Sequence, residues 1–189
     1  MADQLYLSYW LRNYSEQSML RQYEKVLRLF PFSRLAKQPS TFRVMAVDEN
    51  EAAVLEVAFP PPLKPEDIIS AAKDFQNADC AYRLETRWDL WQFDIDWELM
   101  PTRVALCCYG PEFVKEDDAH LTIEFGIDAH FLPQPEIGNS LTFVQSNIKS
   151  LLKLVHDLDD ALPVESRKLW SESGENFSEK LHQALLTTD

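Results

Sequence analysis

The chain has 189 residues, of which 46% are hydrophobic and 12% are aromatic, and its formal net charge is −13. This composition can bury a core and excludes a disordered protein, and the length predicts a single domain over residues 1–189. There is no uninterrupted apolar run of about 18 residues and no signal-peptide pattern, so we expect a cytoplasmic protein without a membrane partner.

The charge is unevenly distributed along the chain. Residues 1–47 carry seven basic and three acidic side chains, so this segment has a charge of +4 and the remainder has −17. An acidic surface repels a phosphate backbone, which argues against nucleic acid as a partner. The same charge would attract a basic protein, although its simplest role is to keep the protein soluble.

The three cysteines, Cys80, Cys107 and Cys108, predict buried thiols rather than disulfides, because their number is odd and two of them are adjacent. Adjacent residues of a strand point to opposite faces, so one of the adjacent pair could be a reactive thiol while the other lies in the core. No basic partner is visible beside them in the sequence, and we therefore favour inert thiols.

In chain order, strands and helices follow from the spacing of apolar residues and from the prolines and turn residues between them. The first elements are a strand, a helix, two strands and a second helix, at residues 4–11, 13–30, 41–47, 52–59 and 65–75. A further strand region at residues 80–99 changes the phase of its alternation near Leu90, which predicts a bulge or a break. Another strand follows at residues 103–109.

The most regular strand covers residues 119–132, and we expect the sheet to be organised around it. Its apolar residues share one face and its polar residues share the other. The apolar face consists of Leu121, Ile123, Phe125, Ile127, Ala129 and Phe131, and the polar face of His120, Thr122, Glu124, Gly126, Asp128 and His130. From residue 139 the period becomes helical, which predicts a long helix before Pro163 and a short one after Asn176.

This order of elements predicts an α+β fold with an antiparallel sheet of about six strands and helices packed on one face. The first six elements follow the β-α-β-β-α-β order of a ferredoxin-like sandwich. Two further strands extend this core within residues 1–135, and residues 139–189 supply C-terminal helices. An uncovered sheet edge would also allow self-association into a homo-oligomer.

No motif in the chain specifies a catalytic site. Only four glycines occur, which excludes the glycine-rich phosphate-binding loops. The best remaining cluster combines carboxylates and imidazoles from the last strands, which could bind a metal ion or exchange protons if those strands were neighbours. Its members include Asp94, Asp96, His120, Glu124 and Asp128. A solvated sheet face shows the same pattern and we favour that interpretation, so no metal and no cofactor is assigned.

Three closely spaced tryptophans, Trp88, Trp91 and Trp97, could form a recognition surface, although aromatic residues in strands more often belong to the core. We favour a non-enzymatic interaction or regulatory protein, such as an inhibitor, whose acidic sheet edge or tryptophan-rich segment docks a partner. The alternative is a small hydrolase that uses the carboxylate and histidine cluster, either with a divalent cation or by acid–base catalysis.

Overall fold

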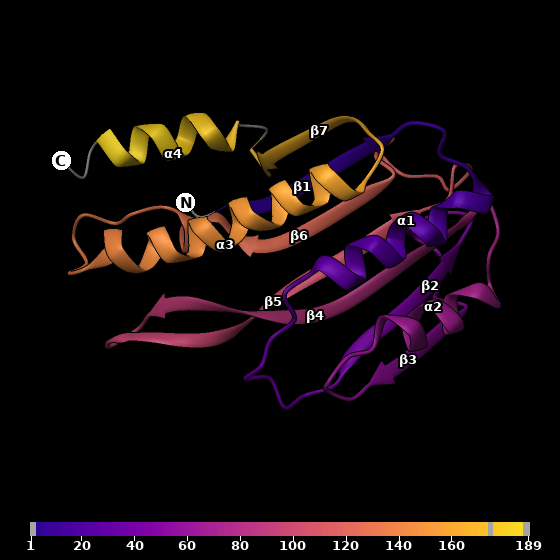
Figure 1. The fold of residues 1–189 in the computed structure, drawn as a ribbon, viewed down its shortest axis with the longest axis horizontal. Coiled ribbons are helices and arrows are strands. Elements are labelled where there is room, and N and C mark those ends of the chain that lie inside the picture. Colours follow the sequence, from indigo (N-terminus) through magenta and orange to yellow (C-terminus); the bar gives the residue numbers. More distant parts are fainter. Residues whose placement is uncertain (1–2, 174–175, 187–189) are drawn as a thin grey trace.

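The computed structural model describes residues 3–173 and 176–186, which form an antiparallel sheet of seven strands, one more than the sequence predicts (Figure 1). The strand order is β3-β2-β4-β5-β6-β1-β7. The strands are β1 (Gln4–Leu11), β2 (Ser40–Ala46), β3 (Leu55–Phe59), β4 (Cys80–Phe93), β5 (Trp97–Tyr109), β6 (Leu121–Ile127) and β7 (Val164–Ser171).

Three helices lie over the same face of the sheet in Figure 1, and they are α1 (Glu16–Leu29), α2 (Pro65–Lys73) and α3 (Ser140–Ala161). A fourth helix, α4 (Phe177–Leu186), contacts β7, and a short 3₁₀ helix, η1 (Asp128–Phe131), follows β6. The α+β class and the packing of helices on one face agree with the sequence. Within the described residues no helix has the length and apolar character that crossing a membrane requires.

The predicted central strand is observed as β6, which is shorter than expected. The side chains of Leu121, Ile123 and Phe125 are at most 2% exposed, so the apolar face packs into the core as the alternation predicts. The strand ends at Ile127, whose side chain is exposed rather than buried. Gly126 has a φ of 81°, which is a left-handed conformation that turns the chain out of the strand, and the next residues wind into η1.

The ferredoxin-like topology is not confirmed. β1 pairs with β6 and β7, and neither of these strands belongs to the first six elements. The connection from β1 through α1 therefore passes over β6, β5 and β4 before the chain enters the sheet again as β2. The order of elements along a chain does not specify which strands pair, because a helical connection can return to more than one position in the sheet.

β7 is a strand that the sequence pattern does not predict, since residues 139–189 were expected to contain helices only. It pairs antiparallel with β1, from Leu5 opposite Ser171 to Leu11 opposite Val164. Its residues 165–168 are all exposed. An edge strand that buries little of either face has no alternation of apolar and polar residues, so periodicity does not detect it.

The hairpin of β4 and β5 extends beyond the rest of the sheet (Figure 1). β2 pairs with β4 no further than Glu85, and β6 pairs with β5 no further than Ala105. The two strands of the hairpin themselves pair without a shift of register as far as Phe93 opposite Trp97, so the bulge or break predicted near Leu90 is wrong. The phase of the apolar alternation changes for another reason. Beyond Leu90, Trp91 and Trp97 pack on Phe143 at the start of α3 instead of on the central core.

Candidate functional site

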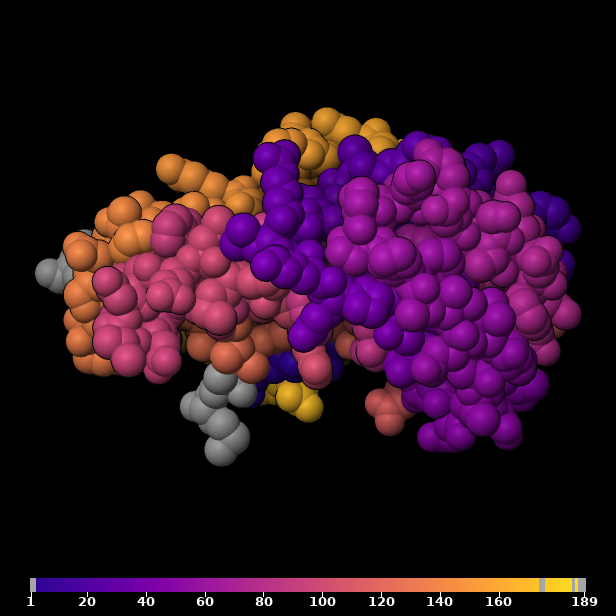
Figure 2. Space-filling model, turned by 90° about the horizontal axis from the view of Figure 1, so that it is seen from below, coloured from indigo at the N-terminus to yellow at the C-terminus, as the bar shows by residue number. Residues whose placement is uncertain are grey.

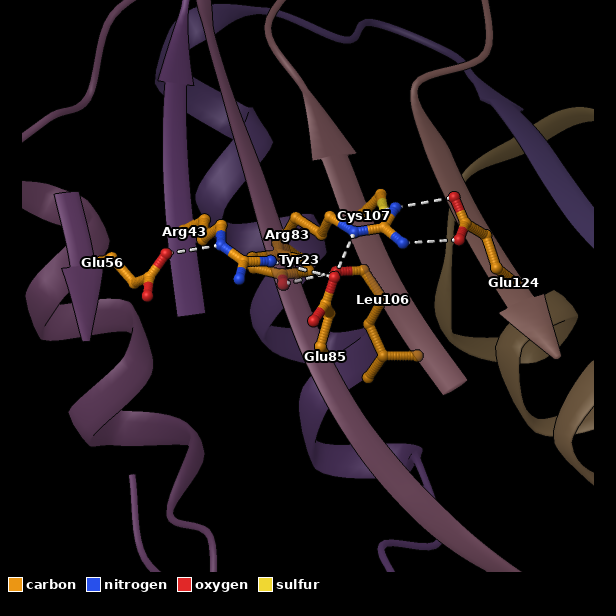
Figure 3. Close-up of polar contacts among 8 residues, drawn as sticks. All are labelled: Tyr23, Arg43, Glu56, Arg83, Glu85, Leu106, Cys107 and Glu124. Carbon is orange, nitrogen blue, oxygen red and sulfur yellow. Dashed lines mark hydrogen bonds and ion pairs between the residues drawn. The ribbon is translucent and has the colours of Figure 1, made fainter. Parts of the chain in front are cut away.

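The face of the sheet opposite the helices, called here the open face, carries a row of ion pairs that crosses from β3 to β6. Figure 3 shows the row, which consists of Glu56, Arg43, Glu85, Arg83 and Glu124. Arg83 of β4 reaches across β5 and donates to both carboxylate oxygens of Glu124, with N–O distances of 2.7 Å for each. Bidentate pairing of this kind fixes both the position and the orientation of the two groups.

Arg83 lies above the thiol of Cys107, which is on β5 between the two partners of the ion pair. Its Nη1 atom is 3.5 Å from Cys107 Sγ. Hydrogen bonding to Glu124 raises the pKa of Arg83 above its ordinary value, so the guanidinium stays charged. Burial nevertheless raises the pKa of Cys107 to about 11, so the thiol is protonated at neutral pH.

We predict that none of the three cysteines reacts while the protein is folded. Cys80, Cys107 and Cys108 are all free and buried, and burial raises the pKa of Cys108 to about 12. Titration with Ellman's reagent at neutral pH should detect no fast thiol in the native protein and three after unfolding in guanidinium chloride. Fast reaction of one thiol per chain in the native protein would contradict this expectation and would support the interpretation of that cysteine as a nucleophile.

A hollow of about 470 Å³ opens beside the row of ion pairs on the open face. Two small residues, Ala105 of β5 and Gly126 of β6, line it, and their lack of large side chains helps to leave the space. Arg87 and Arg103 also line the hollow. These two arginines are directly opposite each other on β4 and β5, and neither side chain has a hydrogen bond or ion pair within the described residues.

The predicted cluster of carboxylates and imidazoles is divided among several places in the structure. Glu124 is held by Arg83, as described above. His120 accepts a hydrogen bond at Nδ1 from the Leu11 backbone N–H, at 2.8 Å, and its ring stacks on Tyr14. Burial lowers the pKa of His120, which favours the neutral ring that this bond requires. His120 thus joins the start of β6 to the end of β1.

Asp128 is almost completely buried in η1, where it forms an ion pair with Lys180 of α4 and accepts a hydrogen bond from the Asp3 N–H. Asp94 and Asp96 are exposed at the turn of the β4–β5 hairpin. The structure therefore does not bring the five predicted residues together in one site. Within residues 3–173 and 176–186, no group of three His, Cys, Asp or Glu side chains is placed to hold a metal ion.

The tryptophans of the predicted recognition surface divide in a similar way. Trp88 is 1% exposed and packs in the core, where its neighbours include Phe125 and Phe131. Trp97 is only partly buried, stacks on Phe143 of α3 and donates from Nε1 to the Gly138 carbonyl at 2.8 Å. Aromatic contacts therefore hold the far end of the hairpin against the start of α3.

We call the solvent-exposed part of this hairpin the hairpin end, and it consists of Phe93, Asp94, Ile95, Asp96, Glu98, Leu99 and Met100. Figure 2 shows it in pink at one end of the molecule, next to the orange start of α3. Ile95 at the turn is 91% exposed, while Phe93, Leu99 and Met100 are each 42% exposed. Sequence reasoning missed these apolar residues as a surface, because their alternation resembles that of a buried strand.

Comparison with known proteins identifies no family. No family model matches the chain, and no curated protein or solved structure matches it either. The geometry of the hairpin end and of the hollow is therefore the basis for assigning a function.

Proposed function

We propose that this chain is a non-enzymatic interaction protein that docks a basic partner protein through its hairpin end. The observation that carries the proposal is the exposure of Ile95 at the turn, together with three further apolar side chains beside it. Phe93 and Leu99 share one face of the hairpin and Met100 lies on the other. Exposed apolar residues gathered at one end of a molecule are typical of a protein interaction site. Partner contacts would remove these side chains from water.

Charge supports a basic partner. The hairpin end carries three carboxylates, Asp94, Asp96 and Glu98, and no basic residue lies between Arg87 and Arg103. None of the three forms an ion pair within the described residues. A partner with an apolar recess surrounded by lysine or arginine would therefore complement both the shape and the charge of the hairpin end.

The packing of the hairpin on α3 supports the same proposal. Trp97 is fixed by its hydrogen bond to Gly138 and by its stacking on Phe143. A surface that is already ordered loses little conformational freedom on binding. The tryptophans thus position the hairpin end, and the exposed apolar residues would make the contacts.

The hydrolase alternative has no comparable support. Three of its candidate residues, His120, Glu124 and Asp128, have separate hydrogen-bond or ion-pair partners, and His120 uses its Nδ1 atom to accept a backbone hydrogen bond. The geometry of the described residues therefore favours binding over acid–base or metal-assisted chemistry.

We predict that Ile95→Ser weakens partner binding roughly tenfold, as expected when a central apolar contact is lost. The wild-type chain is used to isolate a partner from a lysate of the source organism at low salt, and the affinity of that purified partner is then measured for each variant. Asp94→Asn and Asp96→Asn should slow association and reduce its dependence on salt. Val54→Ser is the matched control, because Val54 is 51% exposed and lies outside the hairpin. Equal binding by wild type and Ile95→Ser, or no retained partner at low salt, would refute the proposal.

A further inference from the structure

The two arginines of the hollow are in an unfavourable arrangement when nothing is bound. Arg87 and Arg103 occupy directly opposite positions on β4 and β5. Like charges at such positions destabilise a sheet. The chain has 31 acidic residues against 18 basic ones, so carboxylates are abundant. Within the described part of the chain, however, none of them pairs with either arginine.

The other charged groups that line the hollow are already engaged with one another. Glu124 is bound by Arg83, and Glu85 lies between Arg83 and Arg43, with N–O distances of 3.2 and 3.0 Å. The ion-pair row therefore leaves no carboxylate for the opposed arginines. The positive charge of Arg87 and Arg103 remains uncompensated on the open face.

We propose that the hollow binds a small molecule through a carboxylate or phosphate group held between Arg87 and Arg103. A guanidinium presents paired N–H donors that match the oxygens of such a group. The volume of about 470 Å³ suits a small-molecule ligand. Gln4 and Thr41, which also line the hollow, provide neutral hydrogen-bonding groups for the rest of the molecule.

This inference is independent of the proposed docking of a protein at the hairpin end, because it rests on different side chains. The ligand contributes the negative charge that the sheet lacks at this position, so it would stabilise the folded protein. The bound anion would also remove the repulsion between the two arginines.

Calorimetric titration of the purified chain at low ionic strength tests the proposal, with inorganic phosphate and succinate as separate probes. We expect the wild-type protein to bind one of them, and the preferred probe distinguishes a phosphate from a carboxylate ligand. Arg87→Gln and Arg103→Gln should each weaken binding roughly tenfold or more, because each removes a charge-assisted hydrogen-bond donor. Arg21→Gln is the matched control, since Arg21 is an exposed arginine of α1 that does not line the hollow.

Melting temperature without added anion provides a second measurement that separates a binding role from a structural one. Arg103→Gln removes the repulsion, so the unliganded variant should melt at the same temperature as wild type or higher, although it binds the anion weakly. A lower melting temperature for Arg103→Gln than for wild type would show that this arginine stabilises the fold, and it would count against the proposal. Failure of both probes to bind the wild-type chain at millimolar concentration, or equal weakening by Arg21→Gln, would overturn it.

Discussion

Arg83→Met is expected to reduce the free energy of unfolding by about 3 kcal/mol, because it leaves Glu124 without its partner in a partly buried position. The side chains of Arg83 and Glu124 are 28% and 24% exposed, so water replaces the lost interaction only in part. Denaturation by urea, monitored by tryptophan fluorescence, measures the change. Trp88 in the core, together with Trp91 and Trp97 where they pack on Phe143, should report the unfolding of the same sheet.

Arg43→Met is the matched control for this prediction. Arg43 is directly opposite Arg83 on the neighbouring strand, but its partners Glu56 and Glu85 are 59% and 45% exposed. A surface pair of this kind contributes about 0.5 kcal/mol, so the control should remain close to wild type. The double variant Arg83→Met/Glu124→Leu should recover at least half of the lost stability, because no unpaired charge is left. Equal losses for Arg83→Met and Arg43→Met would show that the bidentate pair has no special role.

Local patterns were sufficient to predict the faces of individual elements. The period of two correctly predicts that Leu121, Ile123 and Phe125 lie in the core. In α1, Met19 and Tyr23 are four residues apart and are both buried, as helical spacing requires for one face. These predictions depend only on neighbours in sequence, since the direction of a side chain follows from the local backbone. The same reasoning failed where burial is small, as in β7, and where a distant residue decides which side chains pack together, as Phe143 does for the hairpin.

The candidate sites depended on pairings that no local pattern contains. Arg87 and Arg103 become neighbours only through the register of the β4–β5 hairpin, and Arg83 meets Glu124 only because β5 lies between β4 and β6. Asp128 was predicted on a polar strand face, but the turn at Gly126 carries it into η1, where it meets Lys180. Each of these contacts joins distant parts of the chain, so a prediction with the wrong strand order contains none of them.

The largest single-residue effect expected from backbone geometry is at Gly110, which follows β5. A Cβ atom at this position would lie 2.2 Å from the Ala78 carbonyl oxygen and 2.7 Å from the Cys80 carbonyl oxygen. Both contacts are with backbone, and both oxygens already accept hydrogen bonds, from Glu112 N–H and from Gly110 N–H, each at 2.8 Å. The chain cannot move away without breaking these bonds. Gly110→Ala should therefore destabilise the protein by about 3 kcal/mol.

Gly138→Ala is the comparison that isolates this steric effect from the general change of glycine to alanine. Apart from Gly138 itself and its two chain neighbours, no atom lies within 4 Å of the position that a Cβ atom would take at Gly138, so the substitution meets no obstacle. It should leave stability unchanged or raise it by about 0.5 kcal/mol, because alanine reduces the freedom of the unfolded chain. The two variants are compared by urea denaturation, and by yield of soluble protein if Gly110→Ala does not fold. A Gly110→Ala chain as stable as Gly138→Ala would mean that the segments around Ala78 and Gly110 are not packed as closely as the structure requires, and would place the connection between β5 and β6 in doubt.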